Sequence, residues 1–264
     1  MSLATAPGIC IDHVSLALGE HSVFNDFNLT LKGGQWHAVL GRSGIGKSSL
    51  IKLLAGIHKA DSGSVRATDD QPMNQRLAYM SQDDGLLPWL SVIDNIQLGP
   101  KLRGEKRKYF VDASKALLEK TGLAGWESAL PFELSGGMRQ RVALARTLLE
   151  ERPVVLMDEP FSRLDAITRD ELQNLAFSLL KHKTVVLITH DPVEALRLAS
   201  CVYILHGGHP TRIESVQLTP SNSPRAMDDP MLVSKLGELW SQLGSNSAIV
   251  GYEGHATESG HSAL

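Results

Sequence analysis

A glycine-rich turn between an apolar run and a helical pattern constrains the fold of this chain more than any other feature. Residues 41–48 read G-R-S-G-I-G-K-S, a complete G-x-x-x-x-G-K-[ST] phosphate loop, between the apolar run 36–40 and a helical pattern over 48–55. Glycines let successive backbone N–H groups turn toward a phosphate, and the following helix directs its positive end at the same anion. Lys47 is expected to reach the β- and γ-phosphates, and Ser48 to complete a magnesium shell. We therefore expect a strand–loop–helix unit that binds a nucleoside triphosphate.

A second apolar run ends in two consecutive carboxylates. Residues 154–157 read V-V-L-M and are followed by Asp158 and Glu159. At the carboxyl end of a strand beside the phosphate loop, Asp158 can hold magnesium directly or through water. Glu159 points differently, so we expect it to act as general base, or at least to polarise the attacking water.

A second helix start contains two adjacent glycines. Residues 134–140 read L-S-G-G-M-R-Q and are called the signature segment below. Ser135 can cap the helix that follows, while Gly136 and Gly137 allow backbone N–H groups to approach an anion. A simple cap would explain the serine but not two glycines in a first helical turn, where they cost stability. This segment is therefore interpreted as a second anion-binding helix start.

The order of apolar patterns predicts an α/β fold. Period-2 runs before residue 35 indicate antiparallel strands, and 76–81 is expected to be another short strand. Compact β-rich runs at 154–157 and 184–188 fit strands buried on both faces of a parallel sheet, and a further apolar run at 201–205 precedes a turn. Helical spacing is expected over 88–125, 138–149, 169–180 and 231–243. The prediction is a phosphate-loop NTPase with a parallel-sheet core, an N-terminal antiparallel β subdomain and an inserted α-helical subdomain. The ATPase domain is expected to span 9–243, with the insertion at about 83–150, and 244–264 to form a flexible tail.

Composition narrows the possible partners. The net charge of −3 and pI near 6.4 argue against a nucleic-acid partner, which leaves a basic footprint. No stretch approaches the roughly 18 apolar residues that span a bilayer, and the N-terminus is not expected to be a signal peptide. Two cysteines make neither a disulfide framework nor a metal cluster. The chain is expected to be cytoplasmic.

In order and spacing, four motifs resemble those of the ATP-binding-cassette (ABC) ATPases. They are the phosphate loop, the signature segment, the Asp158–Glu159 pair and the residues Thr-His-Asp at 189–191, called the switch loop below. The resemblance covers about residues 9–207 and implies ATP and Mg²⁺ as nucleotide and cofactor. It also implies a head-to-tail homodimer in which Ser135 and Gly137 touch the γ-phosphate held by the partner's phosphate loop.

The resemblance carries further roles onto single positions. His190 matches a switch histidine that contacts the γ-phosphate, and Gln82 matches a glutamine that senses magnesium and the membrane subunit. Residues 162–165, called the contact loop below, match a dimer-contact segment with Asp165 as its acid. The implied catalytic residues are Glu159, His190 and Gln82, and the implied magnesium ligands are Ser48, Gln82 and Asp158. The implied nucleotide-binding residues are Gly41, Arg42, Ser43, Gly44, Ile45, Gly46, Lys47, Ser48, Ser49, Ser135, Gly136, Gly137 and Gln140.

Three positions depart from the family pattern. Leu18 occupies the place of an aromatic that stacks on adenine, so stacking is left to His21 or Phe24, or adenine is held by apolar contact alone. Met138 replaces a common glutamine, which removes a polar contact. Arg163 replaces a small residue and is expected to add charge at the dimer interface.

The leading hypothesis is the ATPase subunit of an importer with separate membrane permease subunits and, indirectly, a periplasmic or extracellular solute-binding protein. Residues 82–89 (Q-D-D-G-L-L-P-W), with 157–161 and 164–169, resemble ATPases that import nitrate, sulfonate and taurine. Residues 223–225 and 228–230 resemble those for thiamine pyrimidine precursors. The expected location is the cytoplasmic face of the inner membrane, as a peripheral subunit. The competing hypothesis is a soluble cassette ATPase outside transport; a short span between the first two motifs, one cassette and an acidic balance disfavour it.

Overall fold

The computed structural model describes residues 6–206, 211–218 and 223–245. Its strands are β1 (Ile9–Leu18), β2 (His21–Leu31), β3 (Trp36–Leu40), β4 (Ser62–Ala67), β5 (Leu77–Met80), β6 (Val154–Asp158), β7 (Thr184–Ile188), β8 (Cys201–His206) and β9 (Arg212–Gln217). Its α-helices are α1 (Lys47–Leu54), α2 (Val92–Ile96), α3 (Leu98–Leu102), α4 (Val111–Lys120), α5 (Gly136–Leu149), α6 (Ala166–Leu179), α7 (Pro192–Leu198) and α8 (Pro230–Ser245). Short 3₁₀ turns lie at Arg107–Tyr109 and Pro131–Glu133.

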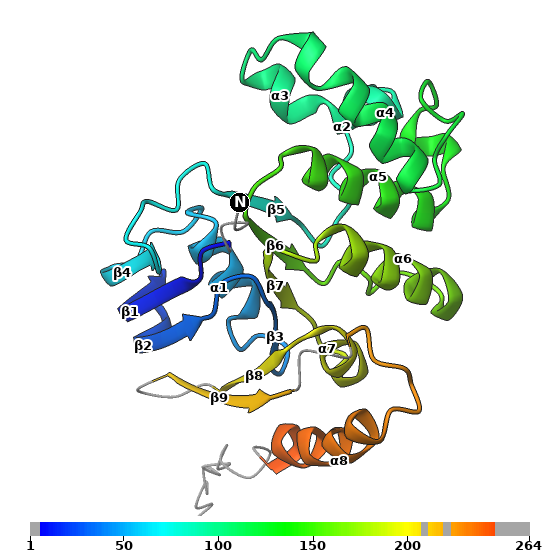
Figure 1. Cartoon of the computed structure of the whole chain (residues 1–264). Coiled ribbons are helices and arrows are strands. Elements are labelled where there is room, and N and C mark those ends of the chain that lie inside the picture. Colours follow the sequence, from blue (N-terminus) through cyan, green and yellow to red (C-terminus); the bar gives the residue numbers. More distant parts are fainter. Residues whose placement is uncertain (1–5, 207–210, 219–222, 246–264) are drawn as a thin grey trace, which may run out of the picture.

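The strands form two sheets (Figure 1). The larger sheet has the order β5-β6-β7-β3-β8-β9. Its first five strands in this order, including β3, are parallel, and β9 is antiparallel to β8. The smaller sheet has the order β2-β1-β4 and is antiparallel. This confirms the predicted parallel core and antiparallel β subdomain. The sequence patterns did not predict β4 and β9, which are antiparallel strands at the edges of the two sheets.

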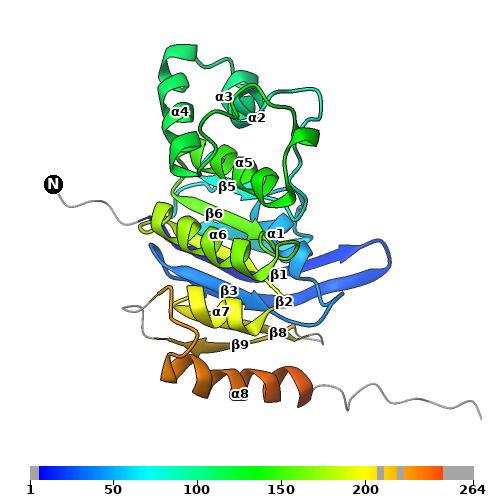
Figure 2. The ribbon, with the colours of Figure 1, turned by 90° about the vertical axis from the view of Figure 1, so that its right-hand side faces the viewer.

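Alternating side chains of the parallel strands bury two different layers. Val39, Leu156 and Val186 face α1 and the antiparallel sheet. Their neighbours Val155 and Leu187 face α5 and α6, while Ala38 and Leu40 face α7 and α8. The continuous apolar runs therefore bury both faces of the sheet, as parallel strands between helices do. Figure 2 shows α6 and α7 stacked along one face of this sheet, with α8 at one end of the molecule.

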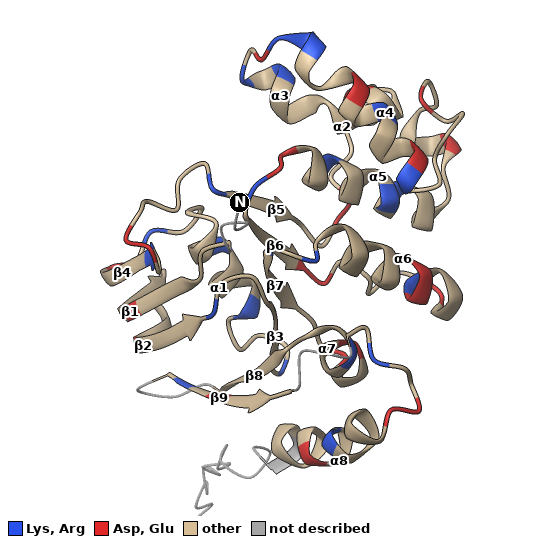
Figure 3. Ribbon diagram, viewed as in Figure 1, with Lys and Arg blue, Asp and Glu red and all other residues tan. Residues whose placement is uncertain are grey.

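The helices between β5 and β6 form a separate layer around α5. Val142, Ala145 and Leu149 of α5 pack with Val92 and Leu118 from the other helices of this layer. On another side, α5 places Ala143 and Leu144 against the parallel sheet. Lys, Arg, Asp and Glu are interspersed over these helices and over α6 (Figure 3). α5 thus belongs to both layers and joins the expected helical insertion to the sheet.

The C-terminal helix begins and ends close to its expected bounds, and α8 reaches Ser245. Most of the expected tail, and the turn expected at Gly207–Gly208, lie outside the described residues. The domain boundaries 9–243, 83–150 and 244–264 stay predictions. Within the described residues, no helix is both long and apolar enough to cross a membrane.

Candidate functional site

The phosphate loop connects the end of β3 to the start of α1. Gly44 and Gly46 have φ angles of +79° and +106°, a region that other residues adopt only with strain. A Cβ atom on Gly46 would lie 2.9 Å from Val23 Cγ1. Glycine at position 46 is therefore required both by the backbone and by the close approach of β2.

Lys47 lies over the phosphate loop rather than in solvent. Its side chain is buried, and its Nζ donates to the carbonyls of Gly41 at 2.8 Å and Arg42 at 3.0 Å. Burial lowers the pKa of the Lys47 amine, and the nearby carboxylates of Glu159 and Asp158 act in the opposite direction. The ammonium group is thus held at the centre of the loop, where a bound phosphate would be neutralised.

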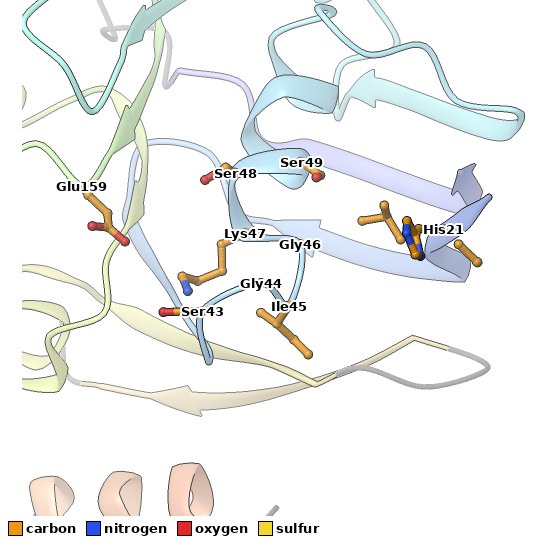
Figure 4. Close-up of a pocket in the computed structure, with 11 residues that line it drawn as sticks. His21, Ser43, Gly44, Ile45, Gly46, Lys47, Ser48, Ser49 and Glu159 are labelled. Carbon is orange, nitrogen blue, oxygen red and sulfur yellow. The ribbon is translucent and has the colours of Figure 1, made fainter. Parts of the chain in front are cut away.

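A cavity of about 570 Å³ opens over this loop and extends to β2. Figure 4 shows the phosphate loop between Glu159 at one end of this cavity and His21 at the other. The lining residues are His21, Ser22, Val23, Ser43, Gly44, Ile45, Gly46, Lys47, Ser48, Ser49 and Glu159. Of the expected phosphate-loop contacts, Gly41 and Arg42 lie just before this lining and hold Lys47 through their carbonyls.

The structure separates the candidates for holding the base. Leu18 does not line the cavity, although it pairs with His21 across the β1–β2 hairpin. Phe24 is buried in the core, with its ring 5.0 Å from that of Phe27. His21 is exposed and lines the cavity at the end away from Glu159. Of the two rings proposed from the sequence, His21 is the one with a face available to a base.

Asp158 ends β6 and lies beside Ser48, which lines the cavity. It is 5% exposed, and the Ser48 hydroxyl hydrogen-bonds its carboxyl. Burial, and then the neighbouring charge of Glu159, raise the pKa of Asp158. A buried carboxylate beside a hydroxyl is an oxygen donor set that fits a hard divalent cation, which would relieve both effects.

Glu159 stands in a strained backbone conformation. Its φ is +45°, and its N–H donates to the Ile188 carbonyl at 2.9 Å. The Glu159 carboxylate accepts from Gln82 Nε2 at 3.2 Å and lies 3.1 Å from His190 Nδ1. β5, β6 and β7 thus bring the three expected catalytic residues to one carboxylate oxygen, from positions far apart in the sequence.

The signature segment lies outside the phosphate-loop cavity. Ser135 Oγ accepts from Met138 N at 3.2 Å and caps α5, as expected. None of the four signature residues expected to bind nucleotide, namely Ser135, Gly136, Gly137 and Gln140, lines the cavity over the phosphate loop. Gly136 and Gln140 instead line a cavity of about 100 Å³ together with Gln82. Gln140 is buried, and its Nε2 donates to the carbonyl of Pro160.

Two arginines of α5 hold the segment after Gln82, which the sequence reading did not anticipate. Arg139 Nε lies 3.0 Å from Asp84 Oδ2. Arg146 donates to the carbonyls of Asp84 at 2.5 Å and Gly85 at 2.8 Å. Arg139 and Arg146 are seven residues apart, a spacing that places both on one face of a helix. This spacing and the two aspartates after Gln82 were the signals in the sequence for these contacts.

The contact loop meets the same segment through an exposed ion pair. Arg163 NH1 lies 2.5 Å from Asp83 Oδ1. Asp165 caps α6 by accepting from Thr168 N at 3.0 Å. Arg163 therefore forms an ion pair within this chain. The expectation that it adds charge at a dimer interface stays a prediction.

Residues 24–162 match the protein family described as ABC transporter. An uncharacterized ABC transporter ATP-binding protein of Haemophilus influenzae is 44% identical over 236 residues, which cover 89% of this chain and 98% of that protein. The aliphatic sulfonates import ATP-binding protein SsuB 1 of Rhodococcus jostii is 41% identical, covering 83% of this chain and 86% of that protein. SsuB of Escherichia coli K12 is 40% identical, covering 80% and 86%.

Solved structures share the fold of this chain. A chain of an ABC transporter in an inward-facing conformation matches with a TM-score of 0.69 and 25% identity, covering 80% of this chain and 83% of that one. The fold also matches cbiO1 of Clostridium perfringens, part of the transporter complex cbiONQ, with a TM-score of 0.72 and 22% identity, covering 88% and 94%. With the phosphate loop and Glu159 lining one cavity and His190 beside Glu159, the chain belongs to the ABC transporter family, as an ATP-binding subunit with ATPase activity.

Proposed function

We propose that this chain hydrolyses ATP to drive solute import through separate membrane permease subunits. The observation that carries the proposal is the meeting of Gln82 and His190 on the carboxylate of Glu159, at one end of the cavity over Lys47. This arrangement connects the hydrolytic carboxylate to two loops at once. Hydrolysis can therefore be coupled to the positions of those loops.

In this proposal the triphosphate lies along the phosphate loop with its γ-phosphate toward Glu159 and its base toward His21. Lys47 would neutralise the β- and γ-phosphates, and Ser48, Asp158 and Gln82 would hold Mg²⁺ through their side-chain oxygens. The metal supplies charge neutralisation of the phosphates. Glu159 accepts a proton from, or polarises, the attacking water, and His190 contacts the γ-phosphate.

The signature segment completes the site of a second copy of this chain. Within one chain, Ser135 and the first residues of α5 do not line the cavity over Lys47. A head-to-tail homodimer would place the α5 start of one copy over the phosphate loop of the other. Its positive helix end would then face the γ-phosphate.

The membrane partner would dock on the segment after Gln82. Trp89 is 71% exposed, and Asp84 and Gly85 are held by α5. This surface suits a short cytoplasmic helix of a permease subunit, and a solute-binding protein would act only through that permease. We place the chain at the cytoplasmic face of the inner membrane as a peripheral subunit.

The solute class is proposed from the relatives. Several are named for aliphatic sulfonate import, which favours a sulfonate such as taurine over nitrate or a thiamine pyrimidine precursor. Deletion of the gene in its source organism should abolish growth on an aliphatic sulfonate as sulfur source. Normal growth there, with loss of growth on nitrate or on the pyrimidine, would reassign the solute.

The ATP-coupled dimer is tested by Glu159→Gln in the full-length chain. The variant keeps the shape of the side chain but removes the water-polarising charge, so Mg²⁺ and ATP should convert it from monomer to dimer on size-exclusion chromatography. Glu119→Gln, an exposed site on α4, is the matched control and should behave as the wild type. A Glu159→Gln chain that binds ATP yet stays monomeric at high concentration would refute the dimer.

A further inference from the structure

A buried carboxyl lies directly behind the switch loop. Glu194, in the first turn of α7, is 4% exposed. Its Oε2 accepts from Gln173 Nε2 of α6 at 3.2 Å, whereas Oε1 has no hydrogen-bond partner within the described structure. A buried polar atom left in this state costs free energy, so packing alone does not account for a glutamate here.

The Glu194 carboxyl connects to the switch loop through Thr189. The Thr189 hydroxyl lies near enough to that carboxyl to lower its pKa against the larger raising effect of burial, and it also accepts from Asp191 N at 3.0 Å. Thr189 and Asp191 flank His190 in the chain. Fixing the hydroxyl of Thr189 therefore fixes the backbone on both sides of the histidine.

The same carboxyl connects to α6, which itself contacts the contact loop through a different residue. Gln173, its hydrogen-bond donor, accepts from Arg197 NH1 at 2.5 Å. Arg169, one helical turn before Gln173, donates to the carbonyls of Phe161 at 3.3 Å and Leu164 at 2.8 Å. Arg169 NH1 also lies 4.0 Å from Asp191 Oδ2, so α6 contacts both the switch loop and the contact loop through Arg169, beside the buried Glu194–Gln173–Arg197 bonds.

The charges around Glu194 favour its protonated form. Asp191 on its own loop repels a negative charge there, while Arg169 from α6 attracts it; Arg197 and Asp170 pair with each other one contact further away. Burial is the largest effect, and together these effects raise the pKa of Glu194 to about 8. At neutral pH the carboxyl therefore holds its proton and can both donate and accept hydrogen bonds.

We propose that Glu194 is a positioning residue for the γ-phosphate contact of His190, acting through Thr189 and held from α6 by Gln173, which in turn accepts from Arg197. The inference rests on the proposed function, in which His190 contacts the γ-phosphate. Loss of the Glu194 link leaves the phosphate loop intact but lets His190 leave the position in which it reads the γ-phosphate. The expected consequence is a loss of discrimination between ATP and ADP.

The test compares the dissociation constants of Mg²⁺-ATP and Mg²⁺-ADP for the full-length chain by calorimetry. Glu194→Ala should lower the ratio of the ADP to the ATP constant at least threefold, with ADP affinity changed less than twofold. Thr189→Val removes the linking hydroxyl with little change of shape and should give the same loss, so the test survives if Glu194→Ala does not fold. Glu194→Gln, which mimics the protonated carboxyl, should restore the wild-type ratio at pH 7, and Glu119→Gln should not change it.

The pH profile separates positioning from a merely structural role. Between pH 7 and pH 9 the wild-type ratio should fall as Glu194 loses its proton beside Asp191, whereas in Glu194→Gln it should fall less. Equal changes for ATP and ADP in Glu194→Ala and Thr189→Val, or identical pH profiles for wild type and Glu194→Gln, would overturn the inference. A wild-type chain that binds neither nucleotide would instead refute the proposed function.

Discussion

The two glycine-containing helix starts of this chain have similar ingredients and different structures. Before α1, Gly44 and Gly46 take left-handed conformations, and the chain folds around the Lys47 ammonium group. At the start of α5, Gly136 and Gly137 are the first two helical residues, Ser135 caps the helix in an extended conformation, and the nearest atom to a Cβ on Gly136 would be 3.9 Å away. The first start lines a cavity of about 570 Å³, and the second does not.

This difference teaches that one start is a complete anion site and the other is half of one. The phosphate loop brings its own cation and a carboxylate for the metal, so it can bind a triphosphate within a single chain. The start of α5 offers a serine and helix N–H groups, but its cation, Arg139, is already paired with Asp84, so its anion must arrive already held by another surface. Mutations in the two starts should therefore fail in different ways.

The largest effect should come from Lys47→Ala. Removing a buried ammonium group that faces two phosphates costs roughly 3 kcal/mol, so ATP affinity should fall about a hundredfold. Calorimetry with Mg²⁺-ATP measures this loss, and Lys120→Ala on the exposed side of α4 is the control. Unchanged ATP affinity would mean that the loop before α1 is not the triphosphate site.

Ser135→Arg should affect turnover and spare binding. An arginine at the start of α5 blocks the surface that closes over the partner's triphosphate, so kcat should fall at least about thirtyfold, or roughly 2 kcal/mol. The ATP dissociation constant of the isolated chain should stay within twofold. Ser178→Arg, an exposed site on α6, controls for the added charge, and ATPase activity that survives Ser135→Arg would refute the half-site.

Alanine in place of Gly46, directly before α1, and of Gly136, the first residue of α5, should change the stability of the fold in opposite directions. Gly46→Ala forces a side chain into a left-handed backbone against Val23 and should destabilise the fold by about 2 kcal/mol. Gly136→Ala places a Cβ whose nearest contact is Arg139 at 3.9 Å, so helix propensity should stabilise the fold by about 0.5 kcal/mol. Chemical denaturation of both variants measures this, and equal destabilisation would erase the distinction between the two starts.

The smallest effect should come from His21→Ala. Stacking of a base on a side-chain ring contributes about 1 kcal/mol, so ATP affinity should fall about fivefold, and His21→Phe should retain it. Leu18→Tyr should give no gain, because Leu18 does not line the cavity. His182→Ala, an exposed site after α6, is the control, and an unchanged affinity of His21→Ala would show that the base is held elsewhere.

The parallel core was predictable because its strands are continuous apolar runs that few other structures can bury. β4 and β9 were not, because S-G-S-V-R-A and R-I-E-S-V-Q are polar, edge-strand sequences that are hard to tell from turns. The position of β4 is decided by pairing with β1, far away in the chain, and that of β9 by pairing with β8, the strand directly before it.

The site was predictable where a motif fixes a backbone shape, and less so where side chains meet across elements. The phosphate loop, Asp158 and Glu159 follow directly from local spacing. The meeting of Gln82, Glu159 and His190 was expected from the family, but no spacing in the chain gives their distances. The arginine contacts of α5 and the buried setting of Glu194 depend on how helices pack, which only the folded chain reveals.

The grip of α5 on the segment after Gln82 has a mechanical consequence. Arg146 holds two successive carbonyls and Arg139 holds the Asp84 side chain, so this stretch and the helix behave as one stiff part. An α-helix of 14 residues is a rod about 20 Å long, with Ser135 at its tip. A displacement of Asp84 therefore moves the whole of α5 and with it Ser135, because no flexible loop lies between them to take up the movement.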